Sequence, residues 1–297
     1  MSLVGEFEID GETARKWLTL SINPNGTNNT DVLKPIRSGG ELANRCRDRW
    51  VVDFTGMTLE QATFYEAPFE HLIKRFRSAE PSKHRRWLAR KFWWIFERPR
   101  PALRSKLRSS HRFVATPKVS RLRFFVWLER TILPDNLIIA IVRSDDTSIG
   151  VLESKYHKIW SLRKAAYIGV GNDPTYTPTA TFETFPFPEG LTPNLPALAY
   201  ANDRRAQQIA AVARRLNELR ENWLNPPDLV VRVPEVVPGY PERILPKDED
   251  CAKELKKRTL THLYNRRPAW LDNIHQELDA AVAAAYGGPG ISPMTRF

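Results

Sequence analysis

Cysteine is scarce in this sequence, and long apolar runs are missing. The chain of 297 residues has two cysteines, Cys46 and Cys251, which stand far apart and in no metal-ligand spacing. This usage excludes a disulfide framework and a structural zinc site, and it is typical of a reducing compartment. The longest apolar run, residues 137–142, has strand length, far short of the roughly 18 residues that a membrane span needs. The first residues contain no apolar signal-peptide core, so we expect a cytoplasmic protein without a membrane partner.

The sequence also lacks residues that would carry out a reaction. No Gly-rich turn that could hold S-adenosylmethionine opens a helix, and the nearest candidate, residues 169–171, leads into a Pro-rich segment. Residues 225–228, Asn-Pro-Pro-Asp, approach the Asn/Asp-Pro-Pro-Tyr/Phe motif of amino-methyltransferases, but Asp228 cannot stack on a base as the aromatic residue does. A Pro pair after a helical pattern is explained as a helix stop. We therefore expect no catalytic, cofactor-binding or metal-binding residues in this chain.

Acidic residues are scarce in one part of the chain, where basic residues are concentrated. Residues 71–131 contain 18 Lys and Arg but only 3 Asp and Glu. Residues 1–70 contain 7 Lys and Arg and 11 Asp and Glu, and residues 132–297 contain 20 basic and 20 acidic residues. The middle segment therefore holds more than the whole net charge of +11. A soluble protein this basic usually has a polyanion as its partner. Most of these cations are arginines, whose planar fork matches phosphates and guanine edges.

The basic segment is predicted to bind the backbone of a nucleic acid. A membrane-binding surface would more often place lysines along one amphipathic helix. A solvated face over an aromatic core, which stays an alternative, would normally mix charges of both signs. The residues predicted to contact phosphate are Arg75, Arg77, Arg85, Arg86, Arg90, Lys91, Arg98, Arg100, Arg104, Lys118, Arg121 and Arg123.

Hydrophobic patterning predicts an α+β fold with mixed or antiparallel sheets and interspersed helices. Short strands are expected at residues 50–54, 112–116, 124–128, 137–142, 148–152 and 167–170. Helices are expected to begin near residues 11, 58, 82 and 154, and the one from 82 would end near 97. Thr58 can cap the second of these helices, with Gln61 at the capping-box position. Residues 1–190 would form one α+β domain from these elements.

Residues 191–297 are predicted to form a helical C-terminal domain. Apolar residues spaced by three and four, from Ile209 to Trp223, give a helix over about 198–223 a seam for partner helices. The Pro-rich segment 226–246 would bulge away from this helix. Further helices are expected over about 250–264 and 268–286.

Several stretches, in their order along the chain, resemble a known family. They are residues 23–26 with 29–32, 50–54 with 65–70, 92–94 with 98–101, 171–178 running into 182–188, and, in the tail, 223–226, 260–265 and 280–287. The most specific is Gly-Asn-Asp-Pro-Thr-Tyr-Thr-Pro at 171–178 with Phe-Glu-Thr-Phe-Pro-Phe-Pro at 182–188. Together they look like the C-terminal part of the type IIG/IIL single-chain restriction–modification adenine-N6 DNA methyltransferases. The resemblance covers nearly the whole chain.

The resemblance implies a target-recognition domain followed by a helical tail, with double-stranded DNA as the partner. In that family the S-adenosylmethionine site and the catalytic motif lie N-terminal to this part, in a methyltransferase core that this chain lacks. The parent enzyme would flip an adenine out of the duplex and methylate its N6, while this part selects the site. Where this chain has Thr175, the family often has arginine.

Base-reading side chains are expected around the later strands, where they would contact base edges in the major groove. The first choice is Lys155, Lys158, Arg163, Asn172 and Thr175, and the second is Asn25 and Asn28 in the polar loop 23–31.

Two other functions stay open. A module for RNA or single strands would expose Trp93, Trp94 or Trp127 as stacking platforms. A protein-interaction scaffold would use the apolar seam of residues 209–223.

Overall fold

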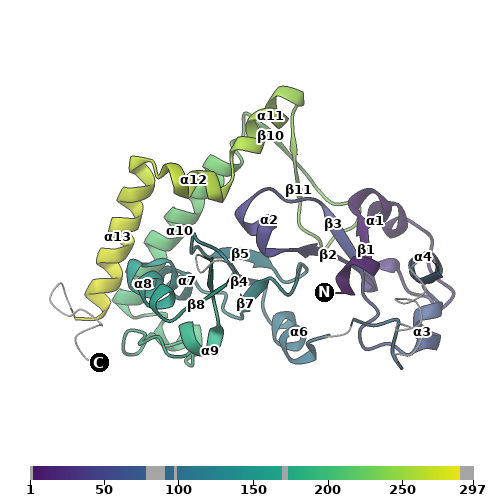
Figure 1. Ribbon diagram of the computed structural model, residues 1–297, viewed down its shortest axis with the longest axis horizontal. Helices are drawn as coiled ribbons and strands as arrows, with labels where there is room; N and C mark the ends of the chain where they lie inside the picture. Colours follow the sequence, from purple (N-terminus) through teal and green to yellow (C-terminus); the bar gives the residue numbers. More distant parts are fainter. Residues whose placement is uncertain (1–2, 78–90, 97–98, 169–172, 288–297) are drawn as a thin grey trace.

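The computed structural model describes residues 3–77, 91–96, 99–168 and 173–287 (Figure 1). They form an α+β fold with small, mostly antiparallel sheets and a helical C-terminal region, as the patterning predicted. The buried side chains fall into two groups. The N-terminal cluster lies mainly within residues 7–96, and the C-terminal cluster lies mainly within residues 107–285.

The N-terminal cluster packs around a four-stranded sheet. Its strand order is β1 (Glu8–Asp10), β3 (Arg49–Val52), β2 (Leu33–Arg37) and β6 (Leu133–Pro134), and only the β2–β6 pair is parallel. Helices α1 (Gly11–Leu18), α3 (Leu59–Thr63) and α4 (Glu66–Arg77) accompany this sheet. The capping box that the sequence predicts at the start of α3 is present, with Thr58 and Gln61 bonded reciprocally.

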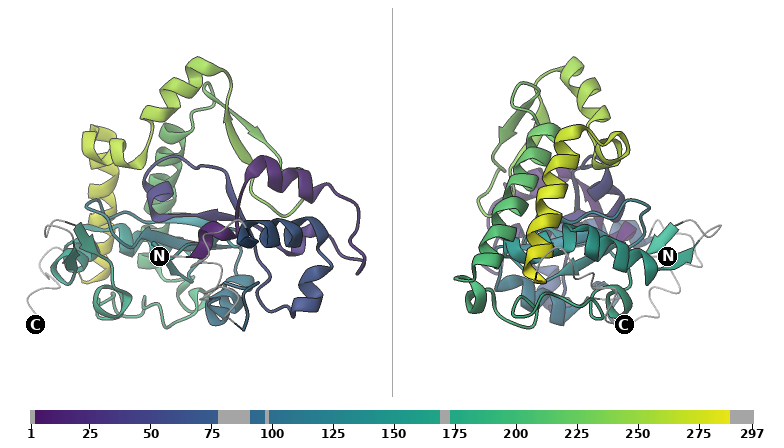
Figure 2. Two further views of the ribbon diagram at one scale, coloured as in Figure 1. Left: turned by 45° about the vertical axis from the view of Figure 1, so that its right-hand side comes forward. Right: turned by 90° about the vertical axis from the view of Figure 1, so that its left-hand side faces the viewer.

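The C-terminal cluster joins a second sheet to a group of helices. The sheet has the order β5 (Val126–Glu129), β4 (Arg112–Pro117) and β7 (Ile138–Ile141). The helices include α7 (Asp146–Glu153), α8 (Lys155–Arg163), α10 (Arg204–Leu224) and α13 (Ala269–Ala285). Figure 2 shows α10 and α13 side by side. The predicted seam of α10 is real, since Ile209 and Leu216 are fully buried, and its partners α7 and α13 belong to the same chain.

Residues 226–246, here called the strap, leave the end of α10, reach the N-terminal cluster and return (Figures 1 and 2). The strap contains β10 (Val230–Val233), which pairs antiparallel with β11 (Arg243–Pro246). Between them, the Tyr240 hydroxyl donates to the carbonyl oxygens of Thr30 and Leu33 at 3.0 and 2.9 Å, and its ring packs against Trp50. The strap therefore completes the N-terminal core with a residue from far along the chain.

Three local predictions are corrected by the structure. Residues 148–152, expected as a strand, belong to α7, whose residues from Thr147 to Glu153 are all buried. A helix buried on all sides shows no 3.6-residue periodicity and cannot be told from a buried strand by pattern. The single helix expected over 250–264 is two helices, α11 (Glu249–Lys257) and α12 (Leu260–Arg266). Residues 91–95 of the helix expected from 82 to 97 form turns and a bend, and most of the others lie outside the described ranges.

The predicted domain boundary near residue 190 stays a prediction. The C-terminal cluster contains buried residues on both sides of it, including Phe185 and Leu191. The N-terminal cluster takes in Val237 and Tyr240 from the strap, which was expected to bulge away. Each hydrophobic cluster therefore contains residues from both sides of the predicted boundary.

Candidate nucleic-acid interface

Helix α8 carries three of the predicted base-reading residues, and the chain then enters a short β-ribbon. In this ribbon β8 (Ala166–Ile168) pairs antiparallel with β9 (Asp173–Thr175). Residues 118–121 run along the other side of β9, since Val119 forms a bridge with Thr175 and the Tyr176 amide donates to the Lys118 carbonyl oxygen at 2.7 Å. We call residues 118–121 with β8 and β9 the ribbon. It projects at the edge of the molecule (Figure 2, right).

The inner face of α8 is fixed by a buried network of charges around Glu153. This carboxylate is 1% exposed and accepts hydrogen bonds from the Phe125 amide at 2.6 Å and from Arg220 at 2.8 Å. The Lys158 ammonium lies 2.7 Å from its other oxygen. Burial alone would raise the pKa of Glu153, but the Lys158 and Arg220 cations outweigh it and lower the pKa to about 2. Lys158 is thus part of the internal framework.

A buried histidine joins α8 to the end of the ribbon. His157 is fully buried, with Nδ1 3.0 Å from the Leu152 carbonyl oxygen and Nε2 3.1 Å from the Tyr176 hydroxyl. A carbonyl can only accept, so Nδ1 carries the proton and Nε2 accepts from Tyr176. Burial lowers the pKa of His157 to about 3, which keeps the ring neutral. The His157 ring therefore packs in the interior.

The outer side of α8 and the β8 strand of the ribbon are open to solvent. Lys155 and Arg163 are exposed at the two ends of α8, and Lys164 is exposed directly after it. Every residue of β8 is exposed, with Tyr167 at 52% and Ile168 at 48%. Sequence reasoning did not single out Lys164, and it missed the exposure of Tyr167 and Ile168 because a strand with apolar residues is normally assigned one buried face.

The predicted contacts in and beside the ribbon divide into exposed and buried side chains. Lys118 and Arg121 are exposed, and Arg121 also forms an exposed ion pair with Asp173 at 3.1 Å. Thr175 is buried, and its hydroxyl has no hydrogen-bond partner within the part of the chain that the structure describes. Arg123 is buried and donates to the Thr116 hydroxyl at 2.8 Å and the Pro117 carbonyl oxygen at 2.5 Å. Burial lowers its pKa to about 10. Arg123 serves the interior, so we leave it out of the proposed interface.

The other described phosphate candidates belong to a second region. Arg75 and Arg77 are exposed on α4, Lys91 is exposed, and Arg100 is exposed before helix α6 (Pro101–Arg108). Arg104 is different, because it forms an ion pair with the buried Asp53 and donates to the Pro99 carbonyl oxygen. Figure 1 places α4 and α8 at opposite ends of the long axis. The predicted cations on α4 therefore lie far from those on α8.

The polar loop 23–31, which holds the second-choice base-reading residues, lies far from the ribbon in sequence. Some of its side chains form hydrogen bonds within the loop itself. Asn25 is exposed, and its side-chain oxygen accepts hydrogen bonds from the Thr27 amide and hydroxyl at 3.2 and 2.7 Å. Asn28 is exposed and precedes a 3-10 turn without capping it through its side chain. Five predicted contacts lie outside the described residues, namely Arg85, Arg86, Arg90, Arg98 and Asn172.

The residues that resemble a catalytic motif end a helix. Asn225 is the C-cap of α10, and its amide group donates to Glu221 at 3.1 Å. The two prolines that follow stop the helix, as the sequence predicted. Within the described ranges, no group of three or more His, Cys, Asp or Glu side chains could hold a metal ion. The same ranges contain no helix with both the length and the apolarity to cross a membrane.

No family model and no curated protein matches this chain. One solved structure that is similar is that of the type IIL restriction–modification enzyme MmeI in complex with DNA, with a TM-score of 0.59 and 16% sequence identity. The similarity covers 97% of this chain and 32% of the MmeI chain, so this chain spans about a third of that enzyme's length. At this identity the comparison shows a shared fold, which is one that occurs in a restriction–modification enzyme.

Proposed function

We propose that this chain binds double-stranded DNA sequence-specifically, as the target-recognition part of a site-specific adenine-N6 DNA methyltransferase in a restriction–modification system. The observation that carries the proposal is the fold shared with MmeI over 97% of this chain, in a structure that contains DNA. S-adenosylmethionine and the catalytic motif would belong to a methyltransferase core outside this chain. That core and the DNA duplex are the proposed partners.

The ribbon and the outer side of α8 are the proposed contact surface. Within the ribbon, β8 and β9 form a two-stranded hairpin, and a pair of strands is narrow enough to enter the major groove of B-DNA. Lys118 and Lys164 would neutralise phosphates beside it, while Lys155 and Arg163 would reach base edges. The buried Glu153 and His157 contacts hold α8 and the ribbon in a fixed relation, and such support lets side chains read bases in a defined register.

Two features of the structure weigh against the alternative functions. A single-strand-binding module would stack bases on exposed tryptophans, but Trp94 is 7% exposed and Trp93 and Trp127 are half-buried. Arg112 also covers the Trp127 ring, 3.8 Å from its centroid. A scaffold would offer the seam of α10 to another protein, but α7 and α13 already cover that seam.

The first experiment compares a random-sequence duplex with a matched single strand at two salt concentrations, by fluorescence anisotropy. We expect the duplex to bind more tightly and its affinity to fall steeply with salt, because cations that neutralise phosphates release counterions. Tighter binding to the single strand, or an affinity for the duplex that does not change with salt concentration, would contradict the proposal.

Variants of the contact surface separate phosphate contacts from base reading. Lys118→Gln with Lys164→Gln should weaken binding to all duplexes and make the salt slope shallower by about 1 for each cation. Lys155→Ala and Arg163→Ala should instead change the sequences that are selected from a random duplex pool. Lys253→Gln, an exposed cation on α11, is the matched control. If both alanine variants kept the sequence preference of the unaltered chain, α8 would not be the element that reads the bases.

A further inference from the structure

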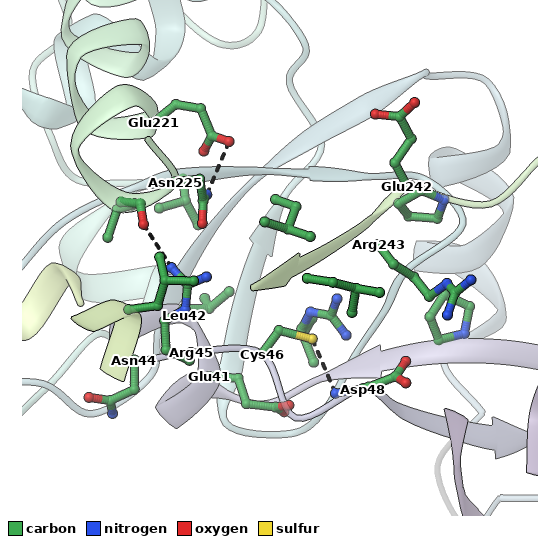
Figure 3. A pocket seen from close by; sticks show the side chains of 18 of the residues that line it. Glu41, Leu42, Asn44, Arg45, Cys46, Asp48, Glu221, Asn225, Glu242 and Arg243 are labelled. Carbon is green, nitrogen blue, oxygen red and sulfur yellow. Dashed lines mark hydrogen bonds between the residues drawn. The ribbon is translucent and has the colours of Figure 1, made fainter. Parts of the chain in front are cut away.

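A cavity of about 580 Å³ lies under the strap, between the two hydrophobic clusters (Figure 3). It is bordered by β11 from the strap, by the end of α10, and by the segment after helix α2 (Gly39–Ala43). Its volume falls in the range of small-molecule sites. None of the ribbon residues lines it, so this cavity is distinct from the proposed DNA contact surface.

Two guanidinium groups at the cavity have no carboxylate at ion-pair distance within the described residues. Arg45 donates only to the Leu224 carbonyl oxygen, at 2.9 Å, and Arg37 only to its neighbour's carbonyl oxygen, at 3.1 Å. Burial lowers the pKa of Arg45, and nearby Glu221 offsets this only in part. A cation removed from water without a counter-ion is costly, so an anion would stabilise Arg45, and Arg37 adds a second positive charge to the lining of the same cavity.

Most carboxylates that line the same cavity are already neutralised by other cations. Glu41 pairs with Arg49, Asp48 with Arg15, and Glu221 with Arg232. Glu235, whose side chain is 2% exposed, pairs with Arg15 and Arg243. With these pairs formed, the cations Arg37, Arg45 and Lys256 outnumber Glu242, the remaining lining carboxylate, so the charge left in the described lining is positive.

The remaining lining adds an apolar wall and one acceptor. Leu42, Leu128, Leu224 and Leu260 contribute apolar surface. The side-chain oxygen of Asn225 is buried and has no hydrogen-bond partner in the described part of the chain. A ligand that satisfies all three features has an acidic group, an apolar body and an N–H donor.

We propose that this cavity binds a small organic anion whose acidic group is held by Arg37 and Arg45 and whose apolar body lies against the leucines. The ligand contacts both hydrophobic clusters and the strap at once, so its binding stabilises their relative arrangement. It adds a small-molecule site to a chain that is otherwise proposed to bind only DNA and a protein core. The test below needs neither of those partners.

The probe is 8-anilino-1-naphthalenesulfonate, a fluorescent anion with an apolar body and an N–H group. Its neutral counterpart, N-phenyl-1-naphthylamine, lacks only the sulfonate and is the matched control ligand. We expect one anion to bind per chain, and both Arg37→Gln and Arg45→Gln to weaken it by about tenfold or more, the usual effect of losing a charge-assisted contact. The neutral probe should bind weakly to every variant, and Lys253→Gln should bind the anion normally. Phosphate and benzoate, added as competitors, distinguish a phosphate-bearing from a carboxylate-bearing ligand.

Cys46 gives an independent readout of the same cavity. It lines the cavity and is exposed, so in a Cys251→Ser background it should react with a thiol reagent, and the anionic probe should slow that reaction several-fold. Binding that both arginine variants retain, equal binding of the neutral probe, no protection of Cys46, or no binding at all would each overturn the proposal. Circular dichroism of each variant confirms that it is folded.

Discussion

Two histidines are buried, and for each the cost of burying a charged ring outweighs the contacts that favour its protonated form. The Nε2 atom of His157 accepts a hydrogen bond from the Tyr176 hydroxyl, and the Nε2 atom of His275 lies 3.1 Å from the Tyr264 hydroxyl oxygen. Burial lowers the pKa of each from 6.5 to about 3. Both rings are therefore neutral in the folded protein over the whole range in which free histidine gains a proton.

Acid should destabilise the fold in the window between these pKa values. Between about pH 6.5 and pH 3 the unfolded chain binds more protons than the folded one, so stability is fully present above that window and falls as the pH drops through it. We expect each histidine to remove about 2 kcal/mol between pH 7 and pH 5. Urea unfolding at the two pH values measures this.

His157→Gln is expected to lower stability at pH 7 but to reduce the loss between pH 7 and pH 5. His111→Gln, a change at an exposed histidine, should leave that loss unchanged and serves as the control. A His157→Gln protein with the full pH dependence would show that this ring does not stay neutral in the fold.

Among helices, α7 and α10 meet at a glycine. A Cβ added at Gly150 would lie 2.5 Å from the Ile209 Cγ2 atom and 3.1 Å from the Ala213 Cβ atom. Gly150→Ala should destabilise the protein by about 1–3 kcal/mol through overpacking, although alanine favours helix by about 1 kcal/mol. Thermal and urea unfolding measure the change.

Gly40 in α2 offers a matched control, because a Cβ there would meet only the Ser38 hydroxyl oxygen at 3.9 Å. Gly40→Ala should be neutral or slightly stabilising. If Gly150→Ala were also stabilising, the two helices could separate without cost, and the close approach at Gly150 would not be required.

Elements with one exposed and one buried side were predicted well from sequence, and those without were not. The stripe of α10 and the capping box of α3 were both found, since each depends on local spacing. Helix α7 was missed because it is buried all round. The β8 strand was located, but its exposure on both faces was not, because projection from the body depends on tertiary structure.

For the candidate site, the sequence predicted where cations occur but not which of them are exposed. Exposed cations such as Lys155 and Lys118 were identified from composition and resemblance. Arg123 and Lys158 were placed with them, because a sequence does not show whether an arginine or lysine faces solvent or a buried carboxylate. That distinction depends on partners far along the chain, such as Arg220 beside Glu153.

For the whole molecule, the strap couples two hydrophobic clusters that each have a core of their own. Replacing Glu235 by Gln and Tyr240 by Phe removes the ion pairs of a buried carboxylate with Arg15 and Arg243 and a hydroxyl proton shared between two carbonyl oxygens, which together should cost about 2–5 kcal/mol. We expect one cooperative unfolding transition in the unaltered chain to separate into two in this double variant. Differential scanning calorimetry detects the separation.

Arg232→Gln is the control within the same strap. Its ion pair with Glu221 is exposed on both sides, and such pairs contribute little. It should leave a single transition at nearly the same temperature. A double variant that still unfolds in one transition would mean that the β2–β6 pair and the α2 contacts suffice to couple the clusters.

The contact of Tyr240 with Trp50 also bears on how the chain is made. A ribosome adds about 5–20 residues per second, so on the order of ten seconds separate the emergence of the N-terminal sheet from the arrival of Tyr240. During that interval the Trp50 face and the Thr30 and Leu33 carbonyl groups have no cover from the strap. The core of the nascent N-terminal region is therefore incomplete during that interval, and we expect this apolar surface to be open to chaperone binding until Tyr240 is made.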